Sequence, residues 1–229
     1  MTELTYLTDT YTFTGTATIV KTGTNEYGTY IILDRTIFYP QWGGQPSDHG
    51  TVSSESGIFH VDMVRLDEYG VVLHYGTYKD GELRAWMTVS TGIDAERRML
   101  HARIHSAGHL MDIALRNIGI ELTPTKGYHF SDWPYVEYYW TLVEPIESIL
   151  PRLQAEIDHL IELDIPVIVT TDMSVQSPLG KTPRYVQFEG YTGCGCGGTP
   201  VRSSGEIGKV TIRKIKMKEG SLRVSYSVG

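Results

Sequence analysis

Residues 89–109, Val-Ser-Thr-Gly-Ile-Asp-Ala-Glu-Arg-Arg-Met-Leu-His-Ala-Arg-Ile-His-Ser-Ala-Gly-His, contain the point at which the hydrophobic pattern of the chain changes. Asp94 is a suitable N-cap residue for a helix, and Glu96 follows in the first turn. Apolar residues then recur at helical spacing, namely Met99, Ile104, Leu110, Ile113, Ala114 and Ile118, and Gly119 follows them. The pattern predicts a long helix that begins near residue 94.

The chain before this helix has the pattern of a β domain. Runs rich in Thr, Val, Ile and aromatic residues are separated by Gly, Asn and an Asp-Gly pair, and they cover residues 11–20, 30–33, 58–61, 71–75 and 83–89. Short strands with frequent turns are typical of a small barrel or sandwich. We therefore expect a β-barrel domain over residues 1–91.

The chain after residue 92 alternates between helical and strand patterns. Residues 146–163 predict a second, amphipathic helix that ends before Pro166. Strands are expected at residues 128–130, 135–140, 167–170, 209–216 and 222–227. The fold class is therefore α+β, with a second domain over residues 92–229 in which helices pack on an antiparallel sheet.

Composition excludes several classes of protein. The 229 residues are 41% hydrophobic and 21% charged, as in soluble globular proteins. No segment has the ~20 consecutive apolar residues of a membrane-spanning helix. The N-terminus lacks the basic and apolar regions of a signal peptide. The two cysteines are neighbours in the sequence, which excludes a secreted disulfide scaffold. We expect a cytoplasmic protein without membrane contact.

The charge of the chain is unevenly distributed. The formal net charge is −7, yet residues 205–229 hold six Lys and Arg against two Glu, a net of +4, which leaves −11 on the rest. This basic end fits either a local contact with phosphate groups or a solvated strand face.

A metal site is indicated by two separate motifs. His105 and His109 are spaced i and i+4, so both imidazoles lie on one face of a helix and can reach one ion. Cys194 and Cys196 lie in a glycine-rich loop, Gly193–Pro200, whose backbone can turn around an ion. Taken singly, these motifs also fit two surface histidines and a glycine turn with a buried thiol. Together they favour zinc, which prefers imidazole and thiolate ligands.

A second glycine-rich loop covers residues 38–50. It lacks the phosphate-binding pattern G-x-x-x-x-G-K-[ST] and does not open a helix. It is either a hairpin of the barrel or a loop that brings Gln41, Gln45 and Asp48 to a neighbouring site.

These motifs, in this order, resemble those of the AlaX-type alanyl-tRNA editing proteins. That family is similar to the editing domain of alanyl-tRNA synthetase and, more distantly, to that of threonyl-tRNA synthetase. The length fits the medium form, which implies a β-barrel followed by an editing domain. The matching segments are residues 33–40 and 43–48, Asp94 with Arg97 and Arg98, His105–His109, residues 126–130, 196–199 and 205–208.

The resemblance implies that His105, His109 and Cys196 bind Zn²⁺. It also implies the reaction: hydrolysis of the ester that joins a wrong amino acid, chiefly serine, to the acceptor end of tRNA(Ala). Zinc can lower the pKa of water to ~7 and polarise a carbonyl, or it can orient the substrate while another group activates water. Editing is needed because an alanine pocket cannot strongly exclude other small amino acids by binding alone.

One position departs from the family pattern Cys-Gly-Gly-Thr-His. The histidine is the fourth ligand in the family, whereas this chain has Pro200, which has no side-chain donor. Water or substrate could fill the open position, Cys194 or His129 could replace the histidine, or the metal could be weak or absent. We expect three protein ligands plus water, with Cys194 as the next alternative.

Other residues complete the predicted site. Thr125 and His129 are the candidates for catalysis, although Thr125 also fits a turn and His129 a solvated strand face. Substrate contacts are expected from Gly43, Gly44, Gln45, Asp48 and Lys126. Contacts with the acceptor-stem phosphates are a hypothesis for Lys126 and for the cations of the long helix, Arg97, Arg98, Arg103 and Arg116, with solubility as the alternative role.

The sequence thus predicts a zinc-dependent aminoacyl-tRNA deacylase acting in trans. The alternatives are a non-catalytic relative that binds tRNA or another protein with an impaired metal site, and a metallohydrolase for another ester or amide. Retention of His105, His109 and Cys196 favours an enzyme. The oligomeric state and the choice between serine and glycine are left open.

Overall fold

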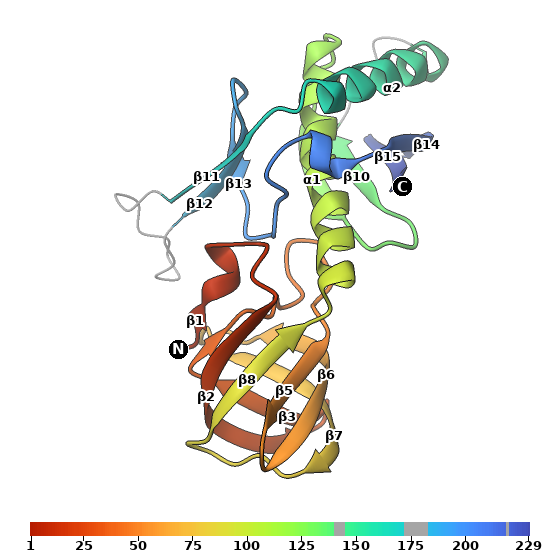
Figure 1. The fold of residues 1–229 in the computed structure, drawn as a ribbon. Helices are drawn as coiled ribbons and strands as arrows, with labels where there is room; N and C mark the ends of the chain where they lie inside the picture. The colour runs from red at the N-terminus through yellow and green to blue at the C-terminus, as the bar shows by residue number, and fades with distance from the viewer. Residues whose placement is uncertain (140–144, 172–182, 219) are drawn as a thin grey trace. The chain divides into compact units, whose positions relative to one another are not determined.

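The computed structural model describes residues 1–139, 145–171, 183–218 and 220–229 (Figure 1). The chain divides into two compact units, Met1–Leu100 and His101–Gly229. The sequence pattern placed the domain boundary near residue 91, at the start of the long helix, and the functional assignment of the two domains stays a prediction. No helix among the described residues is long and apolar enough to cross a membrane.

The first unit is built on a closed six-stranded barrel (Figure 1). Its strands follow the order β2-β3-β7-β6-β5-β8, and every pairing is antiparallel. Their bounds are β2 (Thr14–Asn25), β3 (Gly28–Leu33), β5 (Gly50–Ser54), β6 (Gly57–Leu66), β7 (Val72–Gly81) and β8 (Thr88–Ile93). Outside the barrel, the short strands β1 (Glu3–Leu4) and β4 (Arg35–Thr36) pair in parallel, and the 3₁₀ helix η1 (Thr5–Leu7) lies between them in sequence.

Inward-facing apolar side chains, which alternate with outward-facing ones along the strands, fill the barrel. Along β6 the buried residues Gly57, Phe59 and Val61 alternate with more exposed ones, as expected for a strand with one face inward. The cluster of fully buried side chains includes Ile19, Ile31, Leu33, Phe38, Val52, Phe59, Val61, Val64 and Val72. The predicted N-terminal barrel is confirmed.

The second unit combines helices with two antiparallel sheets. One sheet has the order β14-β15-β10-β9 and the other β11-β12-β13. The elements are α1 (Ala95–Asn117), which begins in the first unit, β9 (Thr123–Tyr128), β10 (Tyr135–Tyr139), α2 (Ile146–Glu162), β11 (Val167–Thr171), β12 (Arg184–Phe188), β13 (Cys194–Gly195), the 3₁₀ helix η2 (Gly205–Ile207), β14 (Val210–Lys218) and β15 (Ser221–Val228). The α+β class is confirmed.

The first strand after α1 differs from its predicted range, and the second matches its prediction. The strand predicted at residues 128–130 is β9 (Thr123–Tyr128), because β9 is an edge strand made largely of exposed residues and carries no alternating apolar pattern. The strand predicted to end at Trp140 matches β10, and Trp140 itself lies outside the described residues.

Asp94 caps α1 as its sequence position predicts. Its Oδ1 accepts a hydrogen bond from the backbone N–H of Arg97 at 3.0 Å, which satisfies one of the free amides of the first turn. The Arg97 side chain donates from Nε to the Ser47 carbonyl at 3.0 Å. The helix start is thereby joined to the glycine-rich loop of the first unit.

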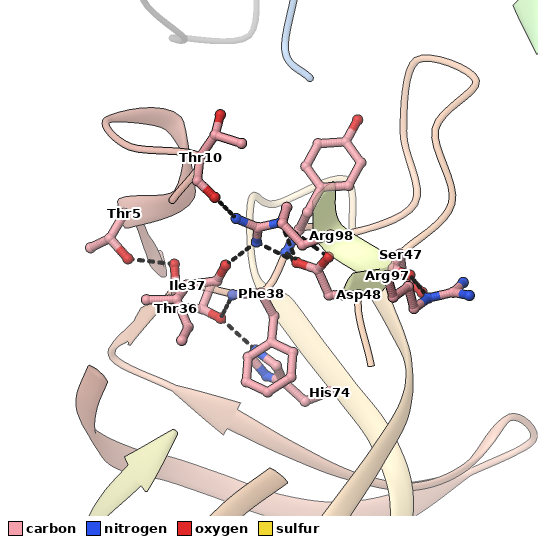
Figure 2. Close-up of polar contacts among 11 residues, drawn as sticks. Thr5, Thr10, Thr36, Ile37, Phe38, Ser47, Asp48, His74, Arg97 and Arg98 are labelled. Atoms are coloured by element: carbon pink, nitrogen blue, oxygen red, sulfur yellow. Dashed lines mark hydrogen bonds and ion pairs between the residues drawn. The ribbon is translucent and has the colours of Figure 1, made fainter. Parts of the chain in front are cut away.

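Arg98, the next residue, is completely buried among acceptors of the first unit (Figure 2). Its Nε lies 3.1 Å from each carboxylate oxygen of Asp48, and Nη2 forms an ion pair with the same carboxylate. Nη1 donates to the carbonyl of Thr10 at 2.8 Å, and Nη2 also donates to that of Ile37 at 2.6 Å. The hypothesis that Arg98 contacts tRNA phosphate is wrong, because the guanidinium has no exposed surface and its donors are occupied.

His74 is a buried titratable group at the barrel core. Its Nδ1 lies 3.0 Å from the Ile31 carbonyl, which can only accept, so Nδ1 carries the proton. Nε2 therefore accepts a hydrogen bond from Thr36 Oγ1 at 2.7 Å (Figure 2). Burial lowers the pKa of His74 from 6.5 to about 4, with the Ile31 hydrogen bond opposing it weakly.

His74 should make the stability of the protein depend on pH. In the unfolded chain His74 regains its ordinary pKa, so between pH 6.5 and 4 the unfolded state binds a proton that the folded state does not. The free energy of unfolding should fall as the pH drops through this window, by about 2 kcal/mol from this group between pH 7 and pH 5. We expect urea denaturation at both pH values to show a smaller drop for His74→Gln than for wild type. His60→Gln, at a partly exposed position of β6, is the matched control; a drop for His74→Gln equal to that of wild type would contradict the assignment.

Candidate metal centre

The two imidazoles of α1 meet one thiol. The three distances between the facing atoms are 3.1 Å for His105 Nε2 to His109 Nε2, 3.2 Å for His105 Nε2 to Cys196 Sγ and 3.3 Å for His109 Nε2 to Cys196 Sγ. His105 and Cys196 are buried, and His109 is partly exposed. Three donor atoms thus form a nearly equilateral triangle, and one of the three residues is partly exposed.

The triangle fits a tetrahedral metal ion. Nitrogen and sulfur ligands of tetrahedral zinc lie about 2.0–2.3 Å from the ion and hence about 3.3–3.6 Å from one another. Across the described residues, His105, His109 and Cys196 are the set of His, Cys, Asp and Glu whose ligand atoms group closely enough to hold one ion. The donor set is therefore a possible metal site, compatible with zinc.

The electrostatic surroundings of Cys196 favour its role as a metal ligand. Burial raises the pKa of its thiol, but the charges and hydrogen bonds of His105 and His109 outweigh burial and lower the pKa well below its usual range. The Gly198 amide also donates to Sγ at 3.3 Å. Thiolate is the form that binds metal.

The Cys196 loop is held in place from two directions. Arg184 Nη1 donates to the carbonyls of Cys196 at 2.8 Å and Gly198 at 3.0 Å, and Ser106 Oγ accepts from the Val201 amide at 3.1 Å. A Cβ on Gly198 would lie 2.4 Å from His105 Cε1, so only glycine lets the loop approach that ring. His105 Nδ1 is buried and has no hydrogen-bond partner within the described ranges.

Cys194 lies behind His109 and outside the triangle. Its Sγ is 3.2 Å from Nδ1, the ring nitrogen that faces away from the other two donors. A histidine that binds metal through Nε2 carries its proton on Nδ1 and commonly donates it to a second group that orients the ring. This geometry suits Cys194 as such an acceptor.

His129 lies next to the triangle in a defined tautomer. Its ring centroid is 4.6 Å from that of His105. Tyr226 donates its hydroxyl proton to the Ile104 carbonyl at 2.9 Å, so the 2.9 Å contact between the same hydroxyl and His129 Nδ1 requires a proton on Nδ1. Burial, together with the charges of His105 and His109, lowers the pKa of His129 well below its ordinary value. The ring is thus neutral at pH 7, with the lone pair on Nε2.

Two glycines make room for this histidine. A Cβ on Gly108 would lie 2.5 Å from His129 Cε1, and a Cβ on Gly127 would lie 2.3 Å from Nε2. Gly108 belongs to the sequence between the two metal-site histidines, so the motif also creates the space that His129 occupies.

The other predicted residues of the second unit lie on β9. Thr125 is exposed, and its Oγ1 donates to the Glu137 carbonyl at 3.1 Å. Lys126 is exposed and is the cross-strand partner of Glu137. Pro200 is buried in the loop after Cys196. Catalysis by Thr125 and substrate contact by Lys126 stay predictions.

The glycine-rich loop belongs to the first unit. Trp42 and Gln45 exchange backbone hydrogen bonds at 2.9 and 3.3 Å, and Gly43 and Gly44 between them have φ values of +54° and +79°, as a two-residue hairpin turn requires. Gln45 is fully buried. Asp48 also accepts from the Tyr39 amide at 2.6 Å, so its carboxylate has a structural role. Substrate contact by Gly43, Gly44, Gln45 and Asp48 stays a prediction.

Sequence reasoning missed three residues that shape the centre: Tyr226, Arg184 and Ser106. Ser106 stands inside the histidine motif and could have been noticed there. Tyr226 lies 97 residues from His129, and Arg184 acts through backbone carbonyls, so no local pattern marks either of them.

Known proteins are similar to this chain in sequence. The family described as tRNA synthetases class II (A) matches residues 3–97. The alanine–tRNA ligase of Thermobifida fusca is 30% identical over 215 residues, which cover 87% of this chain and 24% of the ligase. The ligase of Methanoculleus marisnigri is 31% identical, with 86% and 23% covered. The chain thus spans about a quarter of the ligases that it matches.

A relative of similar length also matches. The alanyl-tRNA editing protein AlaX-M of Methanosarcina acetivorans is 29% identical over an alignment of 245 positions, which covers 99% of this chain and 98% of that protein. The resemblance to AlaX-type alanyl-tRNA editing proteins of the medium form, and to alanyl-tRNA synthetase, is confirmed.

The two cysteines should differ in their effect on metal binding. Cys196→Ala removes a donor of the triangle and should abolish stoichiometric binding of added Zn²⁺ after dialysis. Cys194→Ala removes only the acceptor behind His109 and should keep the stoichiometry while weakening affinity roughly 10- to 100-fold. Elemental analysis and titration against a chelating dye measure both quantities. Full zinc content in Cys196→Ala, or its loss in Cys194→Ala alone, would contradict this geometry.

Proposed function

We propose that this protein is a trans-acting aminoacyl-tRNA deacylase that hydrolyses mischarged tRNA(Ala), chiefly Ser-tRNA(Ala), at a Zn²⁺ site. The observation that carries the proposal is the triangle of His105, His109 and Cys196, 3.1–3.3 Å on each side, in a chain similar over nearly its whole length to an alanyl-tRNA editing protein. We further propose that the protein is cytoplasmic and that its partner is the acceptor end of tRNA(Ala).

Zinc is the metal that the donor set favours. Two imidazoles and one thiolate are ligands that zinc prefers, and three protein ligands with one open position are typical of catalytic zinc. Pro200 supplies no donor, which keeps the fourth position open. When bound, Zn²⁺ would supply a polarised carbonyl or a water of lowered pKa.

The protein's own residues would orient the reactants. The Nε2 lone pair of His129, whose ring centroid lies 4.6 Å from that of His105, would accept a hydrogen bond from the attacking water or from a substrate hydroxyl. Tyr226 keeps this orientation because its proton is already committed to the Ile104 carbonyl. Cys194 would hold His109 with Nε2 toward the metal.

Residues beyond the centre would contribute to selectivity. The Thr125 hydroxyl uses its proton on the Glu137 carbonyl, so it is left as an acceptor toward the hydroxyl of serine. Lys126 would contact phosphate of the acceptor end. Serine differs from alanine by one hydroxyl group. A site that hydrogen-bonds this hydroxyl strongly rejects alanine, which lacks it.

Pro200 supports one alternative. Loss of the family's fourth ligand would suit a non-catalytic relative that binds tRNA or another protein without hydrolysis. The retained triangle and the defined tautomer of His129 favour the enzyme, because a site released from catalysis has no need of either.

Deacylation assays separate these two functions. We expect the purified protein to release serine from Ser-tRNA(Ala), to spare Ala-tRNA(Ala), and to lose activity with a chelator. His129→Gln should slow release roughly 10²- to 10⁴-fold at unchanged zinc content, because it removes the placed acceptor. His159→Gln, at an exposed position of α2, is the control and should match wild type. Zinc-loaded protein without release would contradict deacylation, and full activity of His129→Gln would contradict the role of His129.

A further inference from the structure

The sheet β14-β15-β10-β9 has two chemically different faces. Val136, Tyr138, Leu222, Val224 and Tyr226 are buried on one face, which carries the Tyr226 contact to His129. Side chains alternate along a strand, so the residues between them form the opposite face. We call this opposite face, with the exposed residues at its margins, the outer face.

Cross-strand registers place the outer-face residues in two rows. One row runs Lys214, Ser225, Tyr135, Tyr128, and the other runs Lys216, Arg223, Glu137, Lys126. Each row crosses all four strands. Cationic and aromatic side chains that are distant in sequence are therefore neighbours on one surface.

The outer face is cationic on an acidic protein. Its exposed cations are Lys126, Arg213, Lys214, Lys216 and Arg223, against the carboxylates of Glu137, which pairs with Arg223, and of Asp132, which hydrogen-bonds Tyr128. The whole chain has a net charge of −7. A local positive surface on such a chain selects a polyanion by charge complementarity.

Aromatic rings form a stack on the same face. Phe130 and Tyr128 are stacked at 4.5 Å between centroids with planes 13° apart, and Tyr128 and Tyr135 at 5.2 Å and 15°. Arg223 extends the stack, with its guanidinium carbon 4.0 Å from the Tyr135 centroid.

Two further aromatic residues near β10 have most of their surface exposed. Trp133 is 64% exposed, and the Arg213 guanidinium lies 5.9 Å from its ring centroid. Tyr139, at the end of β10, is 71% exposed. Planar groups next to cations are the features that bind unpaired bases and phosphates.

The stack begins next to the metal centre. Tyr128 ends β9, and His129 follows it directly, with its side chain on Tyr226 at the buried face. The aromatic stack and the catalytic histidine thus lie on opposite sides of one backbone segment at the edge strand of the sheet.

We propose that the outer face binds the acceptor end of tRNA, with Lys214 and Lys216 on its phosphates and the Phe130-Tyr128-Tyr135 stack beside its unpaired bases. The identity of the RNA rests on the proposed function, whereas the RNA-binding role of the face does not. An acidic peptide would use the cations but would leave the aromatic stack without a role, so RNA is the occupant that accounts for both features.

The test is binding of uncharged tRNA(Ala) transcript by fluorescence anisotropy over a range of salt concentrations. Lys214→Gln/Lys216→Gln should weaken binding roughly tenfold and reduce the slope of log affinity against log salt by about 2. Lys21→Gln/Lys79→Gln, at exposed positions of the barrel strands β2 and β7, changes the charge equally and should match wild type. A transcript that lacks its unpaired 3′ end should bind wild type more weakly, because it offers fewer bases to the stack.

The outcomes separate this inference from the proposed function. Equal affinity and slope for the two double variants, or no binding of tRNA by wild type, would overturn the inference whether or not deacylation is found. Equal binding of the full and the shortened transcript would overturn the role of the stack. Binding that depends on Lys214 and Lys216 in a protein that releases no serine would support the inference and contradict only the deacylase.

Discussion

The arrangement of the second unit depends on one contact: the thiol of Cys196 on the two imidazoles that α1 presents one turn apart. Cys196 follows His109 by 87 residues and His105 by 91 residues. The chain must therefore return to α1 for this contact to form. Arg184 and Ser106 hold the returning loop through its backbone, and Gly198 lets it lie against His105. Together these features hold the thiol against the imidazoles.

Much of this design is visible in local sequence. The change of period at Asp94 predicts the start of α1, and the i, i+4 histidines follow from helix geometry alone. Most barrel strands are recognisable because one face is buried, but no predicted run covers β5 (Gly50–Ser54), and the run at residues 83–89 meets β8 (Thr88–Ile93) only at its end. By contrast, β9 has no apolar alternation, and the burial of Arg98 on Asp48 depends on a partner 50 residues away. The position of Cys194 on Nδ1 of His109 instead of in the triangle also follows only from the fold.

The two faces of the sheet β14-β15-β10-β9 carry different parts of the proposed function. Its buried face carries Tyr226, which sets the tautomer of His129, and its outer face carries the cations and aromatic rings. Of the two interpretations that the basic end of the chain allowed, the stack of rings on the same face favours phosphate contact over mere solvation. The proposed catalytic histidine and the proposed tRNA-binding surface would then lie on opposite faces of the same sheet.

The central claim is that three side chains hold a zinc ion and leave its fourth position open. X-ray absorption fine structure at the zinc edge of the purified protein tests this claim directly, because it counts sulfur and lighter ligands separately. The account predicts two imidazole nitrogens, one sulfur at about 2.3 Å and one further light atom. A second sulfur would show that Cys194 closes the site, and a first shell without sulfur would show that the triangle is not the metal centre.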